Sequence, residues 1–264
     1  MLTNYHTHCE LCKHAGGSVL DYAEQAAKNG FDRLGMSDHI PYPDIDYGMR
    51  MDYSNKDLYL DKVMEARQLY NERMEILSGF EAEYLPMYNG YYEELLKDDR
   101  CDYLILGVHF FQLDNGKLQS TYNITDTSMF IEYANKAVEA MRTGYFKCLC
   151  HPDLIGVGDF DIDENYKRAF DIIIDGATKY DFALEYNANG LRRGVGLRGT
   201  KERLQYPISE FWNMVEGTDI KVLVGCDCHN PMQLYDECMK EALEYVGKGR
   251  FNQSTDISIR SAGN

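Results

Sequence analysis

The sequence lacks the features that would place this protein in a membrane or direct it out of the cell. None of its apolar runs is long enough to cross a bilayer, and its first residues, MLTNYHTHCE, have neither the basic start nor the apolar core of a secretory signal. We therefore expect a cytoplasmic protein without a membrane anchor. The chain of 264 residues is 44% hydrophobic, so it can bury a sizeable core, and wholesale disorder is excluded.

Basic side chains are also scarce. Lys and Arg number 27 against 43 Asp and Glu, which gives a formal net charge of −16. A surface this acidic repels polyanions, so extended nucleic acid is not expected as a partner. A small phosphorylated substrate in a locally positive pocket stays compatible with this charge. The sequence does not indicate an oligomeric state.

The eight cysteines do not have the spacing of a zinc ribbon. One C-x-x-C occurs near the N-terminus, but Cys148/Cys150 and Cys226/Cys228 are C-x-C pairs. Because the chain shows no secretion signal, reduced thiols are expected rather than disulfides. We interpret the cysteines as small buried residues, in preference to metal ligands or redox groups.

Short apolar segments typical of buried strands alternate with amphipathic segments typical of helices. The expected strands are Leu2–Tyr5, Arg33–Ser37, Glu75–Phe80, Tyr103–Val108, Phe146–Cys150, Phe182–Tyr186 and Lys221–Gly225. The expected helices are Val19–Asn29, Ser54–Arg73, Met87–Lys97, Ser128–Thr143, Glu164–Lys179, Lys201–Val215 and Pro231–Gly247. No linker divides these units, so a single domain over residues 1–264 is expected, with the polar stretch Phe251–Asn264 as a loosely packed tail.

Seven βα units predict parallel strands with right-handed crossovers, arranged either as an open doubly wound sheet or as a barrel. No G-x-G-x-x-G follows the first expected strand, which disfavours a dinucleotide-binding sheet. Polar, metal-type residues follow nearly every strand, and a barrel brings all strand C-termini to one site. We therefore predict an α/β fold of the (β/α)7 TIM-like barrel type.

The residues at the strand ends carry the clearest functional signal. They are His6, His8, His14, Asp38, His39, Glu81, His109, His151, Asp227 and His229. All seven histidines of the chain belong to this set, and chance does not readily place every one of them at a strand end. Imidazole and carboxylate groups together make mixed N/O sites for Zn, Mn or Fe. In the H-x-H and D-x-H pairs, alternate side chains of an extended segment point to the same face.

These positions resemble the complete motif set of the polymerase and histidinol phosphatase (PHP) superfamily, from His6 to His229. The resemblance implies a distorted (β/α)7 barrel with two to three divalent transition-metal ions (Zn, Mn or Fe) at the strand C-termini. It implies a first ion bound by His6, His8, Glu81 and Asp227, a second bound by Glu81, His109 and His151, and a third bound by His14, His39 and His229.

Within the superfamily, the sequence most resembles the monofunctional histidinol-phosphate phosphatases. The segments that carry this resemblance are Ser37–Pro41 with Arg50-Met51 beyond it, Gly79–Tyr84, and Glu185–Arg192 followed by Tyr206-Pro207. One departure is the run from His151 to Asp159, which lacks the basic residue that those enzymes often have. The resemblance implies hydrolysis of L-histidinol phosphate to histidinol and phosphate in histidine biosynthesis.

The same resemblance assigns roles around the reacting phosphate. Arg192 is expected to contact the phosphate, because a guanidinium donates two parallel hydrogen bonds to it. Arg193 and Arg50 are further candidates, weighed against ordinary solvated charges. Glu81 would bridge two ions with an attacking hydroxide between them, and Asp227 would complete the catalytic centre. Asp38 either takes part in proton transfer or has a structural role, such as orienting His39 or capping a turn.

Other functions share parts of this pattern. The same site could act on another small phosphate ester, a nucleotide or an oligonucleotide end. A TIM-barrel amidohydrolase also begins with H-x-H and ends with a strand-terminal Asp, although it usually binds two metals and often uses a modified lysine. Glu81 and the D-x-H pair favour the three-metal pattern. A non-catalytic metal-binding protein is the remaining alternative, and the complete ligand set argues against it.

Overall fold

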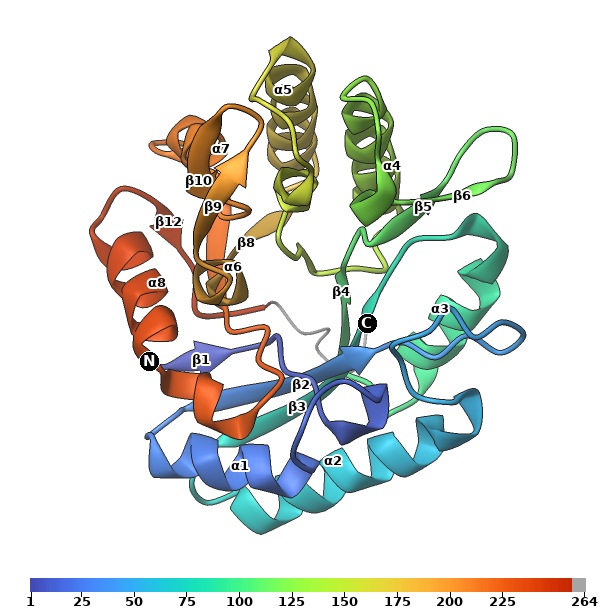
Figure 1. Cartoon of the computed structure of the whole chain (residues 1–264). Helices are drawn as coiled ribbons and strands as arrows, with labels where there is room; N and C mark the ends of the chain where they lie inside the picture. Colours follow the sequence, from blue (N-terminus) through green and yellow to red (C-terminus); the bar gives the residue numbers. More distant parts are fainter. Residues whose placement is uncertain (258–264) are drawn as a thin grey trace.

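A curled parallel sheet forms the centre of the computed structural model, which describes residues 1–257 (Figure 1). Its strands, in spatial order, are β1 (Thr3–Asn4), β2 (Arg33–His39), β3 (Glu75–Ala82), β4 (Tyr103–Leu106), β7 (Cys148–Leu149), β8 (Ala183–Asn187), β11 (Lys221–Gly225) and β12 (Asn252–Gln253). Every neighbouring pair is parallel. This architecture confirms the predicted TIM-like α/β fold.

The segments that follow β1 and β11 pair with each other and close the sheet into a barrel. Thr7 and Cys228 form an isolated parallel bridge. The amide of His8 donates to the carbonyl of Cys228 (3.1 Å), and the amide of Asp227 donates to the carbonyl of His6 (2.9 Å). These backbone bonds hold the segments after β1 and β11 side by side, although the two lie more than two hundred residues apart in the sequence.

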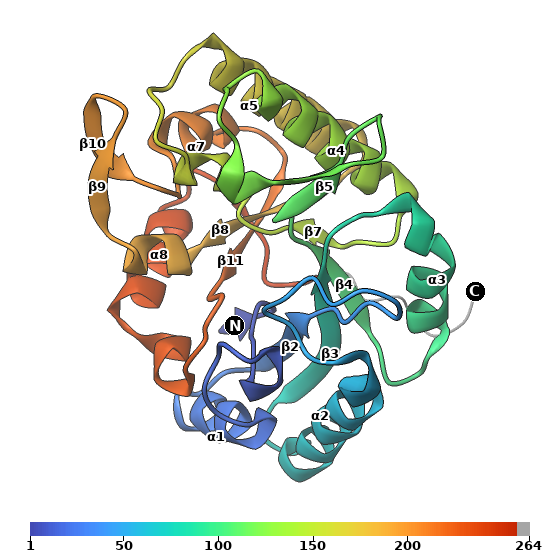
Figure 2. The ribbon, with the colours of Figure 1, turned by 45° about the vertical axis from the view of Figure 1, so that its right-hand side comes forward.

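Helices cover the outside of the sheet (Figures 1 and 2). They are α1 (Val19–Lys28), α2 (Lys56–Tyr70), α3 (Asn89–Lys97), α4 (Met129–Thr143), α5 (Glu164–Lys179), α6 (Ala188–Arg192), α7 (Ser209–Val215) and α8 (Glu237–Gly247). Short 3-10 helices lie at Glu10–Cys12, Tyr53–Asn55, Pro86–Tyr88, Thr121–Asn123, Leu154–Val157 and Pro231–Tyr235. In α5, buried Tyr166, Phe170 and Ile173 recur at helical spacing, which turns one face of the helix to the sheet.

A second, smaller core fills the inside of the barrel. Its buried residues are Tyr5, Leu77, Tyr103, Ile105, Cys148, Cys150, Ala183, Leu223 and Ile257. Ile257 belongs to the segment that was expected to be a loose tail, and this expectation is wrong for residues 251–257. β12 pairs with the first residues of β11, and the Tyr5 hydroxyl donates to the carbonyl of Thr255 (2.8 Å). The segment therefore packs against the amino-terminal end of the barrel; the rest of the expected tail lies outside the described residues.

Two hairpins were not predicted. β5 (Phe110–Gln112) pairs with β6 (Leu118–Ser120), and β9 (Val195–Arg198) pairs with β10 (Lys201–Leu204). The expected helix Lys201–Val215 is therefore wrong in its first half, and only α7 forms there. Gly199 turns the chain with a φ of 59°, a left-handed conformation that favours glycine. Because tertiary contacts decide such short polar strands, their composition alone did not show them.

The remaining helix predictions are confirmed with shifted ends. The segment predicted as Pro231–Gly247 divides into a 3-10 turn and α8, because the Asp236 side chain accepts a hydrogen bond from the amide of Met239 and caps α8. Within residues 1–257, no helix combines the length and the apolar character needed to cross a bilayer.

Candidate metal centre and substrate cavity

The residues expected to bind metal lie at or just after the carboxyl ends of the strands, and all of them except the fully buried His6 and His8 line one cavity of about 680 Å³. His39 is the last residue of β2, and Glu81 is the last but one of β3. The loops after β1, β4, β7 and β11 carry the others: His6, His8, His14, His109, His151, Asp227 and His229. The barrel therefore gathers side chains from the whole length of the sequence at one place.

Glu81 lies at the centre of this group. Its Oε1 is 2.9 Å from His151 Nε2 and 3.3 Å from His109 Nε2. Its Oε2 is 3.0 Å from His39 Nδ1, 3.4 Å from His6 Nε2 and 3.6 Å from His8 Nε2. The two oxygens of one buried carboxylate therefore face two different sets of imidazoles, which is the arrangement that a bridging ligand needs.

The two carboxylate oxygens of Asp227 have different kinds of neighbour. Oδ1 faces the imidazoles, 3.3 Å from His8 Nε2 and 3.7 Å from His6 Nε2. Oδ2 accepts hydrogen bonds from the side-chain amides of Asn189 (3.0 Å) and Asn187 (3.3 Å). The two amides hold the carboxylate so that a single oxygen is directed at the centre.

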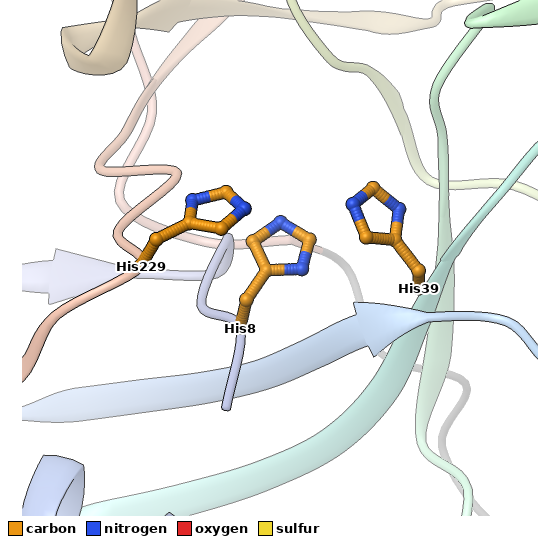
Figure 3. A group of neighbouring side chains, drawn as sticks. All are labelled: His8, His39 and His229. Carbon is orange, nitrogen blue, oxygen red and sulfur yellow. The ribbon is translucent and has the colours of Figure 1, made fainter. Parts of the chain in front are cut away.

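A further group of imidazoles lies beside Glu81 and Asp227. His8, His39 and His229 come from three separate segments, after β1, at the end of β2 and after β11, and their rings gather above the end of β2 (Figure 3). Their ligand nitrogens lie within 4.8 Å of one another. The His14 ring lies 4.7 Å from the His229 ring and 5.2 Å from the His39 ring.

The hydrogen bonds of His6 and His8 test whether this centre fits a cation. His6 Nδ1 is 2.8 Å from Glu185 Oε1, and His8 Nδ1 is 3.3 Å from Asp38 Oδ1. When each Nδ1 donates its proton to the neighbouring carboxylate, each Nε2 is directed at the centre, where its lone pair can bind a metal. The two Nε2 atoms lie 3.1 Å apart. So close an approach needs positive charge between or beside the two nitrogens, which a shared proton or a divalent ion supplies.

The pair His14 and His229 repeats this pattern. His14 Nδ1 bonds to the carbonyl of Cys12 (2.9 Å), and His229 Nδ1 bonds to the carbonyl of Asp227 (3.2 Å). Their Nε2 atoms are 2.9 Å apart. In addition, Glu81 Oε2, His39 Nδ1 and His151 Nδ1 are buried without a hydrogen bond. Mixed imidazole and carboxylate donors of this kind suit Zn, Mn or Fe, so the residues present fit such ions.

The carboxylates of the centre are ionised, and its imidazoles differ in charge. Burial raises the pKa of Glu81, but His109 and His6 outweigh it and hold this pKa well below its usual range, so Glu81 is a carboxylate. Burial and the neighbouring His8 lower the pKa of His39 to about 3 and that of His229 to about 4. Burial also lowers the pKa of His6 and His8, but the surrounding carboxylates outweigh it and raise both, that of His8 to about 9. Metal binding needs neutral imidazoles, so ions that bind at His6 and His8 displace protons there.

Two glycines make room for the carboxylates. A Cβ added to Gly107 would lie 2.4 Å from Glu81 Oε1, and one added to Gly225 would lie 1.7 Å from Glu185 Oε1. The backbone beside the centre is also strained, because His151 and Asp227 have φ values of 32° and 46°. Non-glycine residues rarely adopt such angles, and strain of this kind gathers at functional sites.

The sequence reasoning missed the acidic residues behind the histidines. Glu185, at the centre of β8, binds His6 Nδ1 and also accepts from the amide of His151 (3.2 Å). Glu83 binds His109 Nδ1 at 2.9 Å. The signal that could have indicated them was their place in or just after buried strands, where an unpaired carboxylate is costly.

Replacing Glu185 by glutamine is expected to weaken metal retention about 10- to 100-fold, because a carboxylate behind a ligating histidine fixes its orientation and raises its basicity. Metal content after dialysis against a graded series of chelator concentrations measures this. Glu210→Gln, on an exposed position of α7, is the matched control. Equal retention in both variants would show that Glu185 does not support the centre.

Arg192 does not face the cavity, which corrects the expectation for its side chain. Its guanidinium donates to Asp236 (2.7 Å), to the carbonyl of Cys226 (2.6 Å) and to the carbonyl of Gln233 (2.9 Å). These bonds fasten the 3-10 turn after β11 to the barrel. Because α6 turns adjacent residues in different directions, the neighbouring Arg193 lines the cavity instead.

Arg193 and Arg50 both line the cavity but differ in their partners. Arg50 is buried and forms an ion pair with Glu83 (3.1 Å), so its charge is already balanced. Arg193 forms no ion pair with any residue in the range 1–257, and its guanidinium lies over the ring of Tyr206, 5.5 Å from the ring centre. Arg193 is therefore the arginine available to an anionic substrate.

Asp38 lies behind the metal centre rather than in the cavity. It is fully buried, and its Oδ1 accepts from the backbone amide of His39 (2.9 Å) while facing His8 Nδ1. Its Oδ2 accepts from the thiol of Cys9 (3.1 Å). Through these contacts Asp38 orients the imidazole of His8, whereas one role expected from the sequence was to orient the imidazole of His39. The eight cysteines are free thiols, and all except Cys238 are buried.

Residues 4–189 match the family model described as "PHP domain". The chain belongs to the PHP domain family. A Deinococcus radiodurans protein named "Probable histidinol-phosphatase" is 26% identical over 257 residues, covering 94% of this chain and 95% of that protein. The Bacillus subtilis protein named "Histidinol-phosphatase" is 22% identical over 222 residues, covering 71% of this chain and 81% of that protein.

The likeness to a solved structure extends over nearly the whole chain. The histidinol phosphate phosphatase of Lactococcus lactis, solved with zinc, L-histidinol and phosphate, superposes with a TM-score of 0.69 at 14% sequence identity. The match covers 98% of this chain and 99% of that one. At this level of identity the likeness concerns the fold.

Proposed function

We propose that this PHP protein is a metal-dependent phosphomonoesterase that hydrolyses L-histidinol phosphate to histidinol and phosphate. The observation that carries this proposal is the cavity in which Glu81, surrounded by five imidazoles, lies at the same mouth as the unpaired Arg193. The names of the relatives from D. radiodurans and B. subtilis support the choice of substrate. A cytoplasmic location stays a prediction.

The proposed ligand sets are those that the family resemblance implies, and two of them share Glu81. One site uses His6, His8, Glu81 and Asp227; a second uses Glu81, His109 and His151; a third uses His14, His39 and His229. Divalent ions in these sites supply neutralisation of the phosphoryl oxygens and a water molecule of lowered pKa. The number of ions, two or three, and their identity as Zn, Mn or Fe belong to the proposal.

The residues of the chain then have distinct tasks. Glu81 keeps the two sets of imidazoles at a fixed separation, since each of its oxygens contacts one set. Arg193 binds the phosphoryl group by donating two hydrogen bonds from its planar guanidinium. The ring of Tyr206 holds this guanidinium in position; its centre lies 5.5 Å from the guanidinium and 6.0 Å from the His151 ring. Glu81, His6 and His8 are buried, and burial strengthens the charge interactions among them.

The alternative of an amidohydrolase finds no support in the cavity. Such enzymes often use a modified lysine, and among residues 1–257 no lysine lines this cavity. The lining contains instead the phosphate-compatible Arg193 beside neutral hydrogen-bonding groups such as Asn189 and Tyr206. A phosphate ester therefore suits the cavity better than an amide.

A substrate panel tests the proposal directly. The purified protein is stripped with a chelator, reloaded with Zn, Mn or Fe, and assayed with L-histidinol phosphate, nucleoside monophosphates and an amide. We expect no activity in the stripped protein, recovery on reloading, and the highest kcat/KM with histidinol phosphate. A stripped protein that keeps full activity would reject metal dependence, and a higher kcat/KM for another ester would reject the substrate.

A further inference from the structure

One side of the cavity is apolar, in contrast to the metal centre. Tyr47, Met49 and Phe110 line this side, and we call them the apolar wall. The rings of Tyr47 and Phe110 lie 4.9 Å apart with an interplanar angle of 34°. Met49 is 65% exposed, although large apolar side chains normally pack away from water.

The backbone of the wall is held in a conformation that its sequence does not favour. Gly48 has a φ of 74°, and Met49 follows with a φ of 48°. Glycine adopts this conformation freely, but methionine rarely does, and it costs about 1 kcal/mol or more. The strained residue is the one that extends into the mouth of the cavity, so packing of the protein core does not explain it.

Arg50 fixes this strained segment to the barrel. Its guanidinium donates to the carbonyl of Gly48 (3.1 Å) and to the carbonyl of Ile40 (3.1 Å), and it pairs with Glu83. The same group lies 5.8 Å from the ring centre of Tyr47 and 5.4 Å from that of Phe110. Arg50 therefore ties the backbone at Gly48 and the two aromatic rings of the wall to the barrel.

Several residues separate the wall from the phosphate-binding arginine within the same cavity. From the wall, Arg50 contacts Glu83, and Glu83 contacts His109 (2.9 Å). The rings of His109 and His151 are 5.1 Å apart, and the His151 ring neighbours Tyr206, over which Arg193 lies. An ester whose phosphoryl group is bound by the metal centre and Arg193 can therefore place its alcohol part on the wall without leaving the cavity.

The charges near the wall indicate which alcohol part it accepts. The only carboxylates that line the cavity in the range 1–257 are Glu81 and Asp227, both in the metal centre. The guanidinium of Arg50, paired with Glu83, already contacts the two aromatic rings. The wall therefore offers no carboxylate to a cationic group, whereas a flat, uncharged ring can stack on the aromatic and thioether surfaces.

We propose that the apolar wall of Tyr47, Met49 and Phe110 is the specificity-determining subsite for a flat, neutral ring on the alcohol part of the phosphate ester. This inference rests on the proposed phosphatase function and names the part of the substrate, besides the phosphate, that the enzyme recognises. For histidinol phosphate, that group is the neutral imidazole.

Two substrates separate this subsite from the phosphatase reaction. L-histidinol phosphate carries the ring, whereas 2-aminoethyl phosphate keeps the amine and the phosphomonoester but has no ring. In Met49→Ala and Tyr47→Leu we expect kcat/KM for histidinol phosphate to fall about tenfold, with kcat/KM for 2-aminoethyl phosphate and the bound metal unchanged. Met87→Ala is the matched control, because Met87 is 60% exposed and lies outside the cavity lining.

The outcomes distinguish the two levels of the proposal. A wild-type protein inactive on both esters would reject the proposed function itself. A wild-type protein active on histidinol phosphate, with the same preference for the ring in both wall variants, would reject the subsite alone. An equal loss on both esters would also reject the subsite, since the wall would then act on the shared phosphate end. A loss confined to the ring ester supports it.

Discussion

Glu81→Ala is expected to lower phosphatase activity by roughly 10³-fold or more, the scale seen when a central charge-stabilising group is removed from an active site. The physical reason is that both oxygens of Glu81 are in use, one 2.9 Å from His151 and the other 3.0 Å from His39. Its removal leaves two sets of imidazoles without their shared anion. Initial rates with histidinol phosphate and metal content per chain measure the effect.

Two further variants make the Glu81 result specific. Glu81→Gln keeps the volume of the side chain but removes its charge, and we expect it to lose metal as Glu81→Ala does. Glu65→Ala, on an exposed position of α2, should leave rates and metal content unchanged. Thermal unfolding of each variant confirms that it is folded. Full activity in a folded Glu81→Ala protein would contradict the bridging role.

Arg193→Ala is expected to raise KM for phosphomonoesters about 10- to 100-fold, because a hydrogen bond to a charged group contributes roughly 1.5–3 kcal/mol. Metal content should not change, since none of the proposed ligands bonds to this guanidinium. Arg193→Lys should recover part of the loss, as a point charge without the planar fork. Steady-state kinetics and metal analysis of the same preparations test both statements.

Arg192 provides the contrast for this experiment. Arg192→Ala removes the bonds to Asp236 and to the carbonyls of Cys226 and Gln233, and should lower the free energy of unfolding with little effect on KM. The opposite result, a raised KM for Arg192→Ala and an unchanged KM for Arg193→Ala, would restore the expectation drawn from the sequence. The two variants therefore test whether Arg192, as the sequence resemblance implies, or Arg193, as the structure indicates, contacts the phosphate.

The net charge of −16 gives little information about the site itself. Most of the carboxylates that produce this charge lie away from the cavity, whose lining includes only Glu81 and Asp227 among acidic residues of the range 1–257. Bound divalent ions would make this small region positive. An acidic protein can therefore take an anionic substrate, although its outer surface repels long polyanions.

Much of the fold and of the site follows from the sequence by itself. Period and composition predicted parallel strands with crossover helices, because strands covered on both faces form near-continuous apolar runs. The metal-type residues that follow the strands then favoured a barrel over an open sheet. All seven histidines stand after such runs, and parallel strands must end at the same edge of the sheet. Topology alone thus brings His6 and His229 together, whatever the details of packing.

Other features depended on contacts between distant segments. Glu83 and Glu185 are ordinary acidic residues just after and within a strand, and only the closed barrel places them against His109 and His6. β10, the second strand of its hairpin, formed where the start of a helix was predicted, since local propensity was too weak to decide a short polar segment.

The clearest division between sequence and structure is at Arg192 and Arg193. The sequence determined that arginine follows β8 at the mouth of the barrel. Which of the two side chains reaches the cavity depends on the direction of each residue on α6 and on the partners that the turn after β11 offers to Arg192. Those partners lie about forty residues away in the chain, so only the tertiary structure could decide between the two arginines.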